Sequence, residues 1–255
     1  MTHPCLRSER SPGGFRRLLL ACPERHNALN ADLARALRDA FAENPAEPVV
    51  LGSTGAQVFC SGADLAVGEA ERAEVSALLY ECLEIMITRP GPVIAAVDGP
   101  AVAGGAQLAT AADLRIAGLA ARFRWIGPPG RGLAVGAWVL PDLVGRGRAA
   151  ELAMTGRWVD AAEALAMGLV NRVEPQPMAA AEELATGLAA GSPGSLARVK
   201  AITAAGGLLD RLHAEQEANR EAWAAARPEG PRPGSMPQSD VRDHDLGGPL
   251  TPPKS

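Results

Sequence analysis

The chain has 255 residues, of which 47% are hydrophobic and 21% are charged, a composition close to the average of globular proteins. Its formal net charge of -4 excludes the strongly basic surface that nucleic-acid-binding proteins need. No run of residues approaches the length of about 18 apolar residues that a membrane helix requires, and no signal-peptide pattern is present. We therefore expect a cytoplasmic protein that neither binds nucleic acid nor inserts into a membrane.

The four cysteines are scattered along the chain, at Cys5, Cys22, Cys60 and Cys82. They lack the CxxC spacing of a zinc site, and their spacing indicates no disulfide framework. We therefore expect no metal, and four buried free thiols in a reducing compartment.

In chain order, short apolar runs alternate with longer helical patterns, which favours an α/β fold with crossover connections. The first strand is predicted at residues 15–21, and a helix begins after Asn30, a good N-cap residue. A second strand at 48–51 precedes a helix at 69–88. The continuous apolar run at 92–97 is typical of a strand covered on both faces.

Further along, Gly104–Gly105 are predicted to open a short helix, followed by a strand at 113–117 and a helix at 160–168. Residues 178–227 have a helical pattern that is broken at 191–193. The last 28 residues, 228–255, contain 7 Pro and 4 Gly and few large apolar side chains. Such a segment cannot bury enough surface to offset its ordering entropy, so we expect a tail or an extended arm.

Three glycine-containing loops follow apolar runs, at residues 58–65, 97–117 and 132–173. The pair Gly104–Gly105 at a predicted helix start exposes backbone N–H groups and the positive end of the helix dipole. Such donors bind a phosphate or a developing oxyanion on a carbonyl. The alternative is that both glycines serve close packing alone.

Four sequence blocks share their order and spacing with one known family. They read CPERHNALN (22–30), CSGADL (60–65), PVIAAVDGPAVAGGAQLATAADLRIA (92–117) and GLAVGAWVLPDLVGRGRAAELAMTGRWVDAAEALAMGLVNRV (132–173). With these blocks, the chain resembles the enoyl-CoA hydratase/isomerase family, the crotonase superfamily, over roughly residues 15–205.

The resemblance implies an α/β fold, a crotonase-like spiral of β-β-α units with a C-terminal helical trimerisation region. The core would cover 1–175, the helical oligomerisation region 176–227 and the tail 228–255. It implies an acyl-CoA thioester as substrate or ligand and no other cofactor. A homotrimer or hexamer would assemble through helices whose apolar stripes include Ile202, Leu208, Leu209 and Leu212.

The resemblance also assigns roles to residues. The backbone N–H groups of Ala63 and Gly104 would form an oxyanion hole, where small residues let the thioester approach the main chain. Arg25 and His26 would lie near the CoA phosphates or adenine, or else be a solvated loop charge and a surface histidine. The full set implied to contact CoA is Arg25, His26, Ala28, Ala63, Asp64 and Leu65.

Two positions depart from the family pattern. Where hydratases carry a pair of glutamates that handle the added water, this chain has Gln107 and Gly127. A glutamine can orient a water but cannot accept a proton near neutral pH. In this the chain resembles actinobacterial members that lack both glutamates. Glu69 and Glu71 are the nearest acid/base candidates in the sequence, with surface charges at a helix N-terminus as the alternative.

Two tryptophans, Trp125 and Trp138, stand where bulky aromatics would reshape the acyl pocket, although core packing is the alternative reading. Together these features predict an acyl-CoA-binding protein of fatty acid metabolism that would be named an enoyl-CoA hydratase by similarity. An isomerase or lyase that needs the oxyanion hole without two carboxylates fits the residues better than ordinary hydration. A carrier or scaffold without turnover, in lipid or polyketide metabolism, is the alternative.

Overall fold

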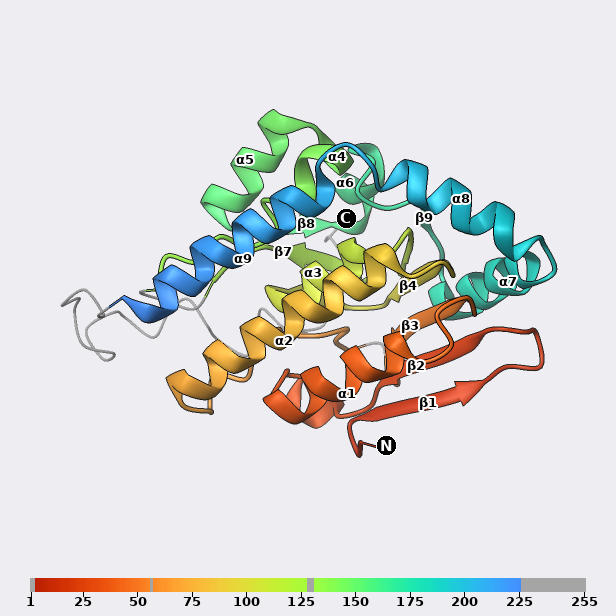
Figure 1. The fold of residues 1–255 in the computed structure, drawn as a ribbon, viewed down its shortest axis with the longest axis horizontal. Helices are drawn as coiled ribbons and strands as arrows, with labels where there is room; N and C mark the ends of the chain where they lie inside the picture. Colours follow the sequence, from red (N-terminus) through yellow and green to blue (C-terminus); the bar gives the residue numbers. More distant parts are fainter. Residues whose placement is uncertain (1–2, 56, 128–130, 226–255) are drawn as a thin grey trace, which may run out of the picture.

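A computed structural model describes residues 3–55, 57–127 and 131–225 (Figure 1). The predicted tail at 228–255 lies outside the described residues. The helices are α1 (Ala31–Ala42), α2 (Glu69–Thr88), α3 (Gly104–Ala111), α4 (Leu140–Val144), α5 (Arg146–Thr155), α6 (Ala161–Ala166), α7 (Pro177–Ala189), α8 (Pro193–Thr203) and α9 (Leu208–Ala224).

The larger sheet has six strands within the described residues, in the order β1-β2-β3-β4-β6-β9. These are β1 (Leu6–Arg10), β2 (Arg16–Leu20), β3 (Val49–Ser53), β4 (Val93–Val97), β6 (Leu114–Ala117) and β9 (Arg172–Val173). β1 pairs antiparallel with β2, and each later neighbour pairs parallel. A smaller sheet in the same part of the chain joins β5 (Pro100–Val102), β7 (Arg122–Arg124) and β8 (Val159–Asp160).

The sheet is covered on both faces. All five residues of β4 are buried, as parallel strands with helices on both sides require. On one face α1, α2 and α3 enclose the main core, and Figure 1 shows α2 crossing the front of the molecule between α1 and α9. On the other face α7 packs its buried Ala181 and Ala185 against Val50 and Ile94.

Most predicted elements are confirmed, α2 with the bounds expected from its pattern. The Asn30 side chain caps α1 by accepting a hydrogen bond from the Leu33 N–H. β1 has no counterpart in the sequence prediction, because four of its five residues are exposed and it carries no apolar alternation. The C-terminal helices are also interrupted a second time, where Gly206 and Gly207 have positive φ.

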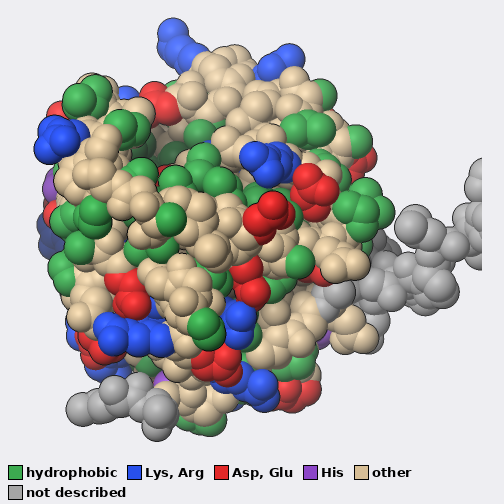
Figure 2. All heavy atoms as spheres, turned by 90° about the vertical axis from the view of Figure 1, so that its right-hand side faces the viewer, with side chains coloured by type: hydrophobic (Ala, Val, Ile, Leu, Met, Phe, Trp, Pro, Cys, Tyr) green, Lys and Arg blue, Asp and Glu red, His purple; other side chains and the backbone are tan. Residues whose placement is uncertain are grey.

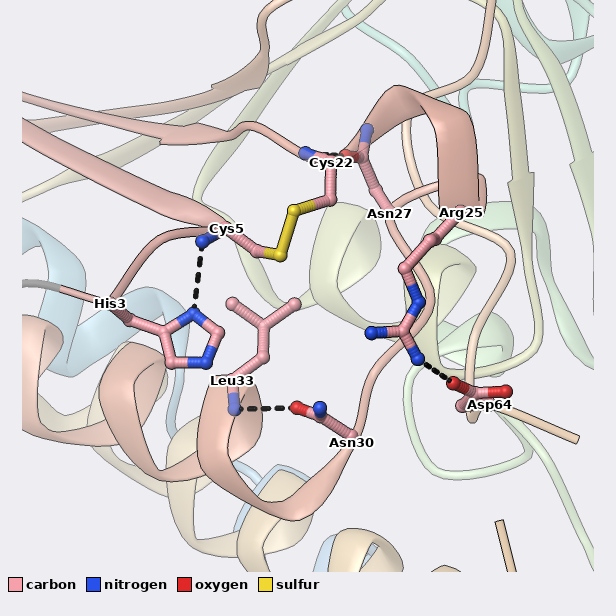
Figure 3. Close-up of a disulfide and its surroundings, with 8 residues drawn as sticks. All are labelled: His3, Cys5, Cys22, Arg25, Asn27, Asn30, Leu33 and Asp64. Carbon is pink, nitrogen blue, oxygen red and sulfur yellow. Dashed lines mark hydrogen bonds and ion pairs between the residues drawn. A yellow bond between two sulfur atoms is a disulfide. The ribbon is translucent and has the colours of Figure 1, made fainter. Parts of the chain in front are cut away.

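The expectation of four free thiols is wrong for two of them. Cys5 and Cys22 form a disulfide, while Cys60 and Cys82 are free and buried. The pairing of β1 with β2 brings the two sulfurs together, since the Ala21 N–H donates to the Cys5 carbonyl at 2.9 Å (Figure 3). Only two of the four cysteines are thus free thiols, so they no longer point clearly to a reducing compartment. The cytoplasmic location stays a prediction.

Across the described residues, no helix combines the length and the apolar character needed to cross a membrane. The same residues contain no cluster of three or more His, Cys, Asp or Glu side chains placed to hold a metal ion.

Candidate functional site

Two loops that are distant in the sequence meet beside the sheet. Cys60 forms a parallel bridge with Ala101, and Leu29 forms one with Ala63. The Leu29 N–H donates to the Gly62 carbonyl at 2.7 Å. A Cβ on Gly62 would lie 3.0 Å from the Gly104 nitrogen, and φ of Gly62 is +84°. Only glycine fits both the backbone angle and this close approach.

The start of α3 is strained and tightly packed. Ala103, immediately before the helix, has φ 49° and ψ -117°, a combination that costs roughly 1–3 kcal/mol for a residue with a side chain. Its N–H donates to the Arg124 carbonyl at 2.9 Å, which holds the turn in place. At Gly105, a Cβ would lie 2.2 Å from the Cys60 carbonyl oxygen. Gly105 therefore serves close packing, the alternative reading of the glycine pair.

The N–H groups of Ala63 and Gly104 take no part in the hydrogen bonds formed among the described residues. Both residues line a cavity of about 60 Å³. A cavity needs about 10–15 Å³ of such space to hold one water, so this space suits a small group rather than a long chain. The wall is completed by α2, by the segment around Leu133, and by Asn219 and Trp223 of α9.

The segment at residues 25–28 lies against the loop that carries Ala63 (Figure 3). The Arg25 guanidinium donates to the Asp64 carboxylate at 2.6 Å. His26 is exposed and has φ 53°, and Ala28 is half-buried. Leu65 is 63% exposed. The structure thus places the residues implied to contact CoA together on one edge of the cavity loops.

Asn27 anchors this segment. Its side chain is buried, accepts a hydrogen bond from the Cys22 N–H at 2.8 Å and donates to the Phe59 carbonyl at 3.0 Å. The interpretation of Asn27 as a turn residue is confirmed, because it holds the segment in shape and faces away from solvent.

Gln107 and Gly127 both line the cavity. The Gln107 side chain is buried, and its oxygen accepts a hydrogen bond from the Trp138 indole N–H at 3.0 Å. A Cβ on Gly127 would lie 3.1 Å from the Leu133 Cβ. A side chain at this position would therefore press against Leu133, which would have to move slightly to admit it.

The two tryptophans predicted to shape the acyl pocket lie in the main core, with exposures of 0% for Trp125 and 1% for Trp138. Trp125 stacks on Phe123 with ring centroids 6.2 Å apart. Neither is among the described residues that line the small cavity, and Trp138 instead lines a second hollow of about 470 Å³.

Glu69 begins α2 and forms an ion pair with Arg131. The Arg131 guanidinium also lies 5.2 Å from the centre of the Trp223 ring and donates to the Ala225 carbonyl. These contacts fasten the end of α9 to the start of α2, beside the cavity. Glu71 is half-buried in the first turn of α2.

A hydrogen-bonded group of three polar side chains at the wall of the cavity was not predicted from the sequence. The Tyr80 hydroxyl donates to the Glu215 carboxylate at 2.8 Å and accepts from the Asn219 amide at 2.7 Å. Glu215 also accepts from the Gly136 N–H at 3.1 Å and the Trp138 N–H at 3.0 Å. The available signal was the spacing of Glu215 and Asn219, which share the inner face of a helix with Leu212.

Burial shifts both ionisable groups of this trio. Burial raises the pKa of the Glu215 carboxyl, and hydrogen bonds from Tyr80 and the backbone N–H groups of Gly136 and Trp138 partly offset the rise. Burial and the nearby Glu215 raise the pKa of Tyr80, while hydrogen bonds from Asn219 and Gln107 lower it in part. At neutral pH the tyrosine is therefore the protonated partner of the pair.

Comparison with known proteins places these features in a family. Residues 13–227 match the family described as enoyl-CoA hydratase/isomerase. The chain is 34% identical over 211 residues to the probable enoyl-CoA hydratase echA6 of Mycobacterium tuberculosis (strain CDC 1551 / Oshkosh), covering 80% of this chain and 84% of that protein. It is 38% identical over 186 residues to a probable enoyl-CoA hydratase of Rhodobacter capsulatus, covering 69% and 70%.

Solved structures agree. The crystal structure of an enoyl-CoA hydratase from Mycobacterium avium subsp. paratuberculosis K-10 superposes with a TM-score of 0.78 at 27% identity, covering 89% of this chain and 97% of that chain. The family match at residues 13–227 includes both cavity loops and the C-terminal helices. The chain therefore belongs to the enoyl-CoA hydratase/isomerase family and has its α/β crotonase fold.

Proposed function

We propose that this chain binds the thioester of an acyl-CoA in the cavity between the loop at 60–65 and the first turn of α3. The N–H groups of Ala63 and Gly104 donate to the thioester oxygen, and α3 directs the positive end of its dipole toward the same point. Membership of the family supports the choice of ligand.

One observation carries this proposal. Ala63 and Gly104 present unused N–H donors to one small cavity, on loops that glycine allows to approach closely. Donors that are fixed before a ligand arrives stabilise negative charge on an oxyanion without reorganisation. Such a site favours the enolate form of a thioester, whose oxygen carries that charge.

The CoA nucleotide would follow the edge formed by residues 25–28 and 63–65. Arg25, already paired with Asp64, supplies a cation at this edge, and exposed Leu65 supplies an apolar surface. His26 and Ala28 complete the proposed contact strip. Trp138 contributes to the acyl end through Gln107, whose amide it holds, while Trp125 supports the wall from the core.

The reaction best supported is proton transfer next to the thioester carbonyl, as in an isomerase or a lyase that passes through an enolate. Hydration requires a water to be positioned and protons to be moved by carboxylates, and Gln107 and Gly127 offer none. A non-catalytic acyl-CoA carrier is the second candidate. It is favoured by the lack of any carboxylate among the described residues that line the cavity.

Calorimetric titration with butyryl-CoA, with free CoA as the reference ligand, tests the proposal. We expect butyryl-CoA to bind more tightly than CoA, since only the thioester reaches both N–H groups. Gly104→Pro removes one donor and should weaken butyryl-CoA binding about tenfold, the value of about one hydrogen bond.

Gly104→Ala is the matched control. A Cβ at this position meets the Leu79 side chain at 2.9 Å, and both variants carry that Cβ, but alanine keeps the N–H. Equal affinities of the two variants, or equal affinities of wild-type protein for CoA and butyryl-CoA, would show that the N–H groups do not hold the thioester.

A further inference from the structure

Proton transfer at a bound thioester requires a side chain that can accept and donate a proton. Few of the residues that line the cavity can do so. Among the described lining residues, Arg72 and Tyr80 are the ionisable side chains. An arginine stays protonated in proteins and cannot accept a proton. Tyr80 is therefore the candidate that the cavity itself presents.

Tyr80 is held with its hydroxyl in a defined direction. Its proton points to the Glu215 carboxylate at 2.8 Å, and the Asn219 amide donates to its oxygen at 2.7 Å. Asn219 is fixed in turn by the Ala134 carbonyl at 2.6 Å and the Ala134 N–H at 2.8 Å. One lone pair of the hydroxyl oxygen is thus occupied by Asn219, and Tyr80 is one of the side chains that line the cavity.

Glu215 is suited to receive the tyrosine proton. It is 6% exposed, and backbone N–H groups of Gly136 and Trp138 hold its two oxygens separately. Such donors let a buried carboxylate keep its charge. The carboxylate can still take up one proton, which neutralises it. Glu215 does not line the cavity, so it reaches a ligand only through Tyr80.

We propose that Tyr80 is the proton-transferring group of this site and that Glu215 acts through it as the terminal acceptor, a step that rests on the proposed thioester binding. A C–H bond next to the thioester carbonyl breaks, its electron pair stays in the enolate, and the proton forms a bond to the Tyr80 oxygen. In the same step the original hydroxyl proton passes from Tyr80 to Glu215. While the enolate is bound, the Tyr80 hydroxyl exchanges its proton with water, and the reverse transfer then returns a solvent proton to carbon, so no other reactant is consumed.

The pair would take the place of the carboxylates that Gln107 and Gly127 do not provide. A tyrosine backed by a carboxylate can remove and return one proton. It leaves no second carboxylate to place a water, which agrees with a proton-shift reaction rather than hydration.

The test is the loss of deuterium from butyryl-CoA labelled at the carbon next to the thioester, followed by mass spectrometry in ordinary water. Wild-type protein should wash the label out, and Tyr80→Phe should slow the loss by a factor of about 10² or more. The concentration of butyryl-CoA that half-saturates the exchange should stay unchanged, because Tyr80→Phe keeps the ring that forms the wall.

Thr88→Val is the control, since it removes an exposed hydroxyl from the same helix, bonded only to the Glu84 carbonyl. It should exchange at the wild-type rate. Glu215→Gln keeps an acceptor oxygen for Tyr80 but cannot take a proton, and should lose exchange while retaining binding. Glu215→Asp restores a carboxylate and should recover part of the rate, which a purely structural role would not predict.

Exchange by Tyr80→Phe at the wild-type rate would overturn the proposal, and if that variant does not fold, exchange by Glu215→Gln decides in the same way. Wild-type protein that binds butyryl-CoA without exchange would also overturn it, and would leave the thioester site standing as that of a carrier. Wild-type protein that does not bind butyryl-CoA in calorimetry would overturn the thioester site itself and the proton relay with it.

Discussion

At the scale of single residues, the proposed chemistry of the cavity depends on two lining residues that carry no carboxylate, Gln107 and Gly127. Gln107 accepts a hydrogen bond from the Trp138 indole N–H, and a Cβ on Gly127 would lie 3.1 Å from the Leu133 Cβ. Both residues were visible in the sequence. The Tyr80–Glu215 pair was not, because its members are 135 residues apart and only the packing of α2 against α9 brings them together.

We predict that hydration of crotonyl-CoA will be far slower than the turnover of about 1–10³ per second that is ordinary for enzymes. Each missing acid/base group typically accounts for a factor of about 10²–10⁴. The decrease of enoyl-thioester absorbance measures the rate, and a turnover number within the ordinary range would contradict the interpretation of Gln107 and Gly127.

The free cysteines allow a second prediction. Burial raises the pKa of the Cys60 thiol to about 12, and burial also raises the pKa of Cys82. Because the thiolate is the reactive form, neither thiol should react with a chromogenic disulfide reagent in the folded protein at pH 8. After denaturation two thiols should react, and four only after reduction of the Cys5–Cys22 bond. Four reactive thiols without a reductant would show that this bond is absent.

At the scale of elements, α3 is positioned by contacts at both of its ends. Its start is set by the turn at Ala103, and its far end is covered by Arg115 of β6. The Arg115 guanidinium donates to the Ala112 carbonyl at 2.5 Å and to the Leu169 carbonyl at 2.7 Å. Burial lowers the pKa of Arg115 to about 10, so the side chain is still charged at neutral pH.

Arg115→Met should lower the free energy of unfolding by about 2–6 kcal/mol, because it leaves two buried carbonyls without a donor at about 1–3 kcal/mol each. The free energy of unfolding of Arg115→Lys should lie between those of the wild-type protein and Arg115→Met. One ammonium group cannot reproduce the planar set of donors of a guanidinium. Urea denaturation measures the difference, with exposed Arg7→Met as the control. A loss below about 0.5 kcal/mol in Arg115→Met would show that water replaces these bonds.

The strands and helices differ in how well the sequence predicted them. α2 and β4 were predicted well because their apolar residues follow one clear period or an unbroken run. β1 could not be predicted from its own residues, since LRSER becomes a strand through its pairing with β2. The break before α9 depends on Gly206 and Gly207, which both have positive φ. Glycine can occur inside a helix as well as at such a break, so the sequence pattern alone did not reveal it.

At the scale of the whole molecule, the apolar stripes of the C-terminal helices divide into two sets. Leu212 is fully buried in the core of its own chain, whereas Ile202 is 74% and Val199 57% exposed on α8. Figure 2, which looks onto the side of the molecule that carries α7 and α8, shows hydrophobic side chains at the surface among charged ones. We therefore expect the subunit interface to lie on the outer face of α8.

We predict a trimer or hexamer by light scattering at micromolar concentration. Ile202→Glu should lower the mass toward that of one chain by placing a charge in an apolar contact, and Ile202→Ala should have a smaller effect. A monomeric wild-type protein, or an unchanged mass for Ile202→Glu, would contradict an interface at α8.

The contacts of α9 determine how the copies of such an assembly would work. Asn219 and Trp223 line the cavity of the chain to which they belong, so the described walls of each site come from one chain. We therefore expect that filling one site does not alter the affinity of the next. Ligand titration should then follow a simple hyperbola with a Hill coefficient of about 1, and the dissociated Ile202→Glu chain should bind as tightly as the assembly.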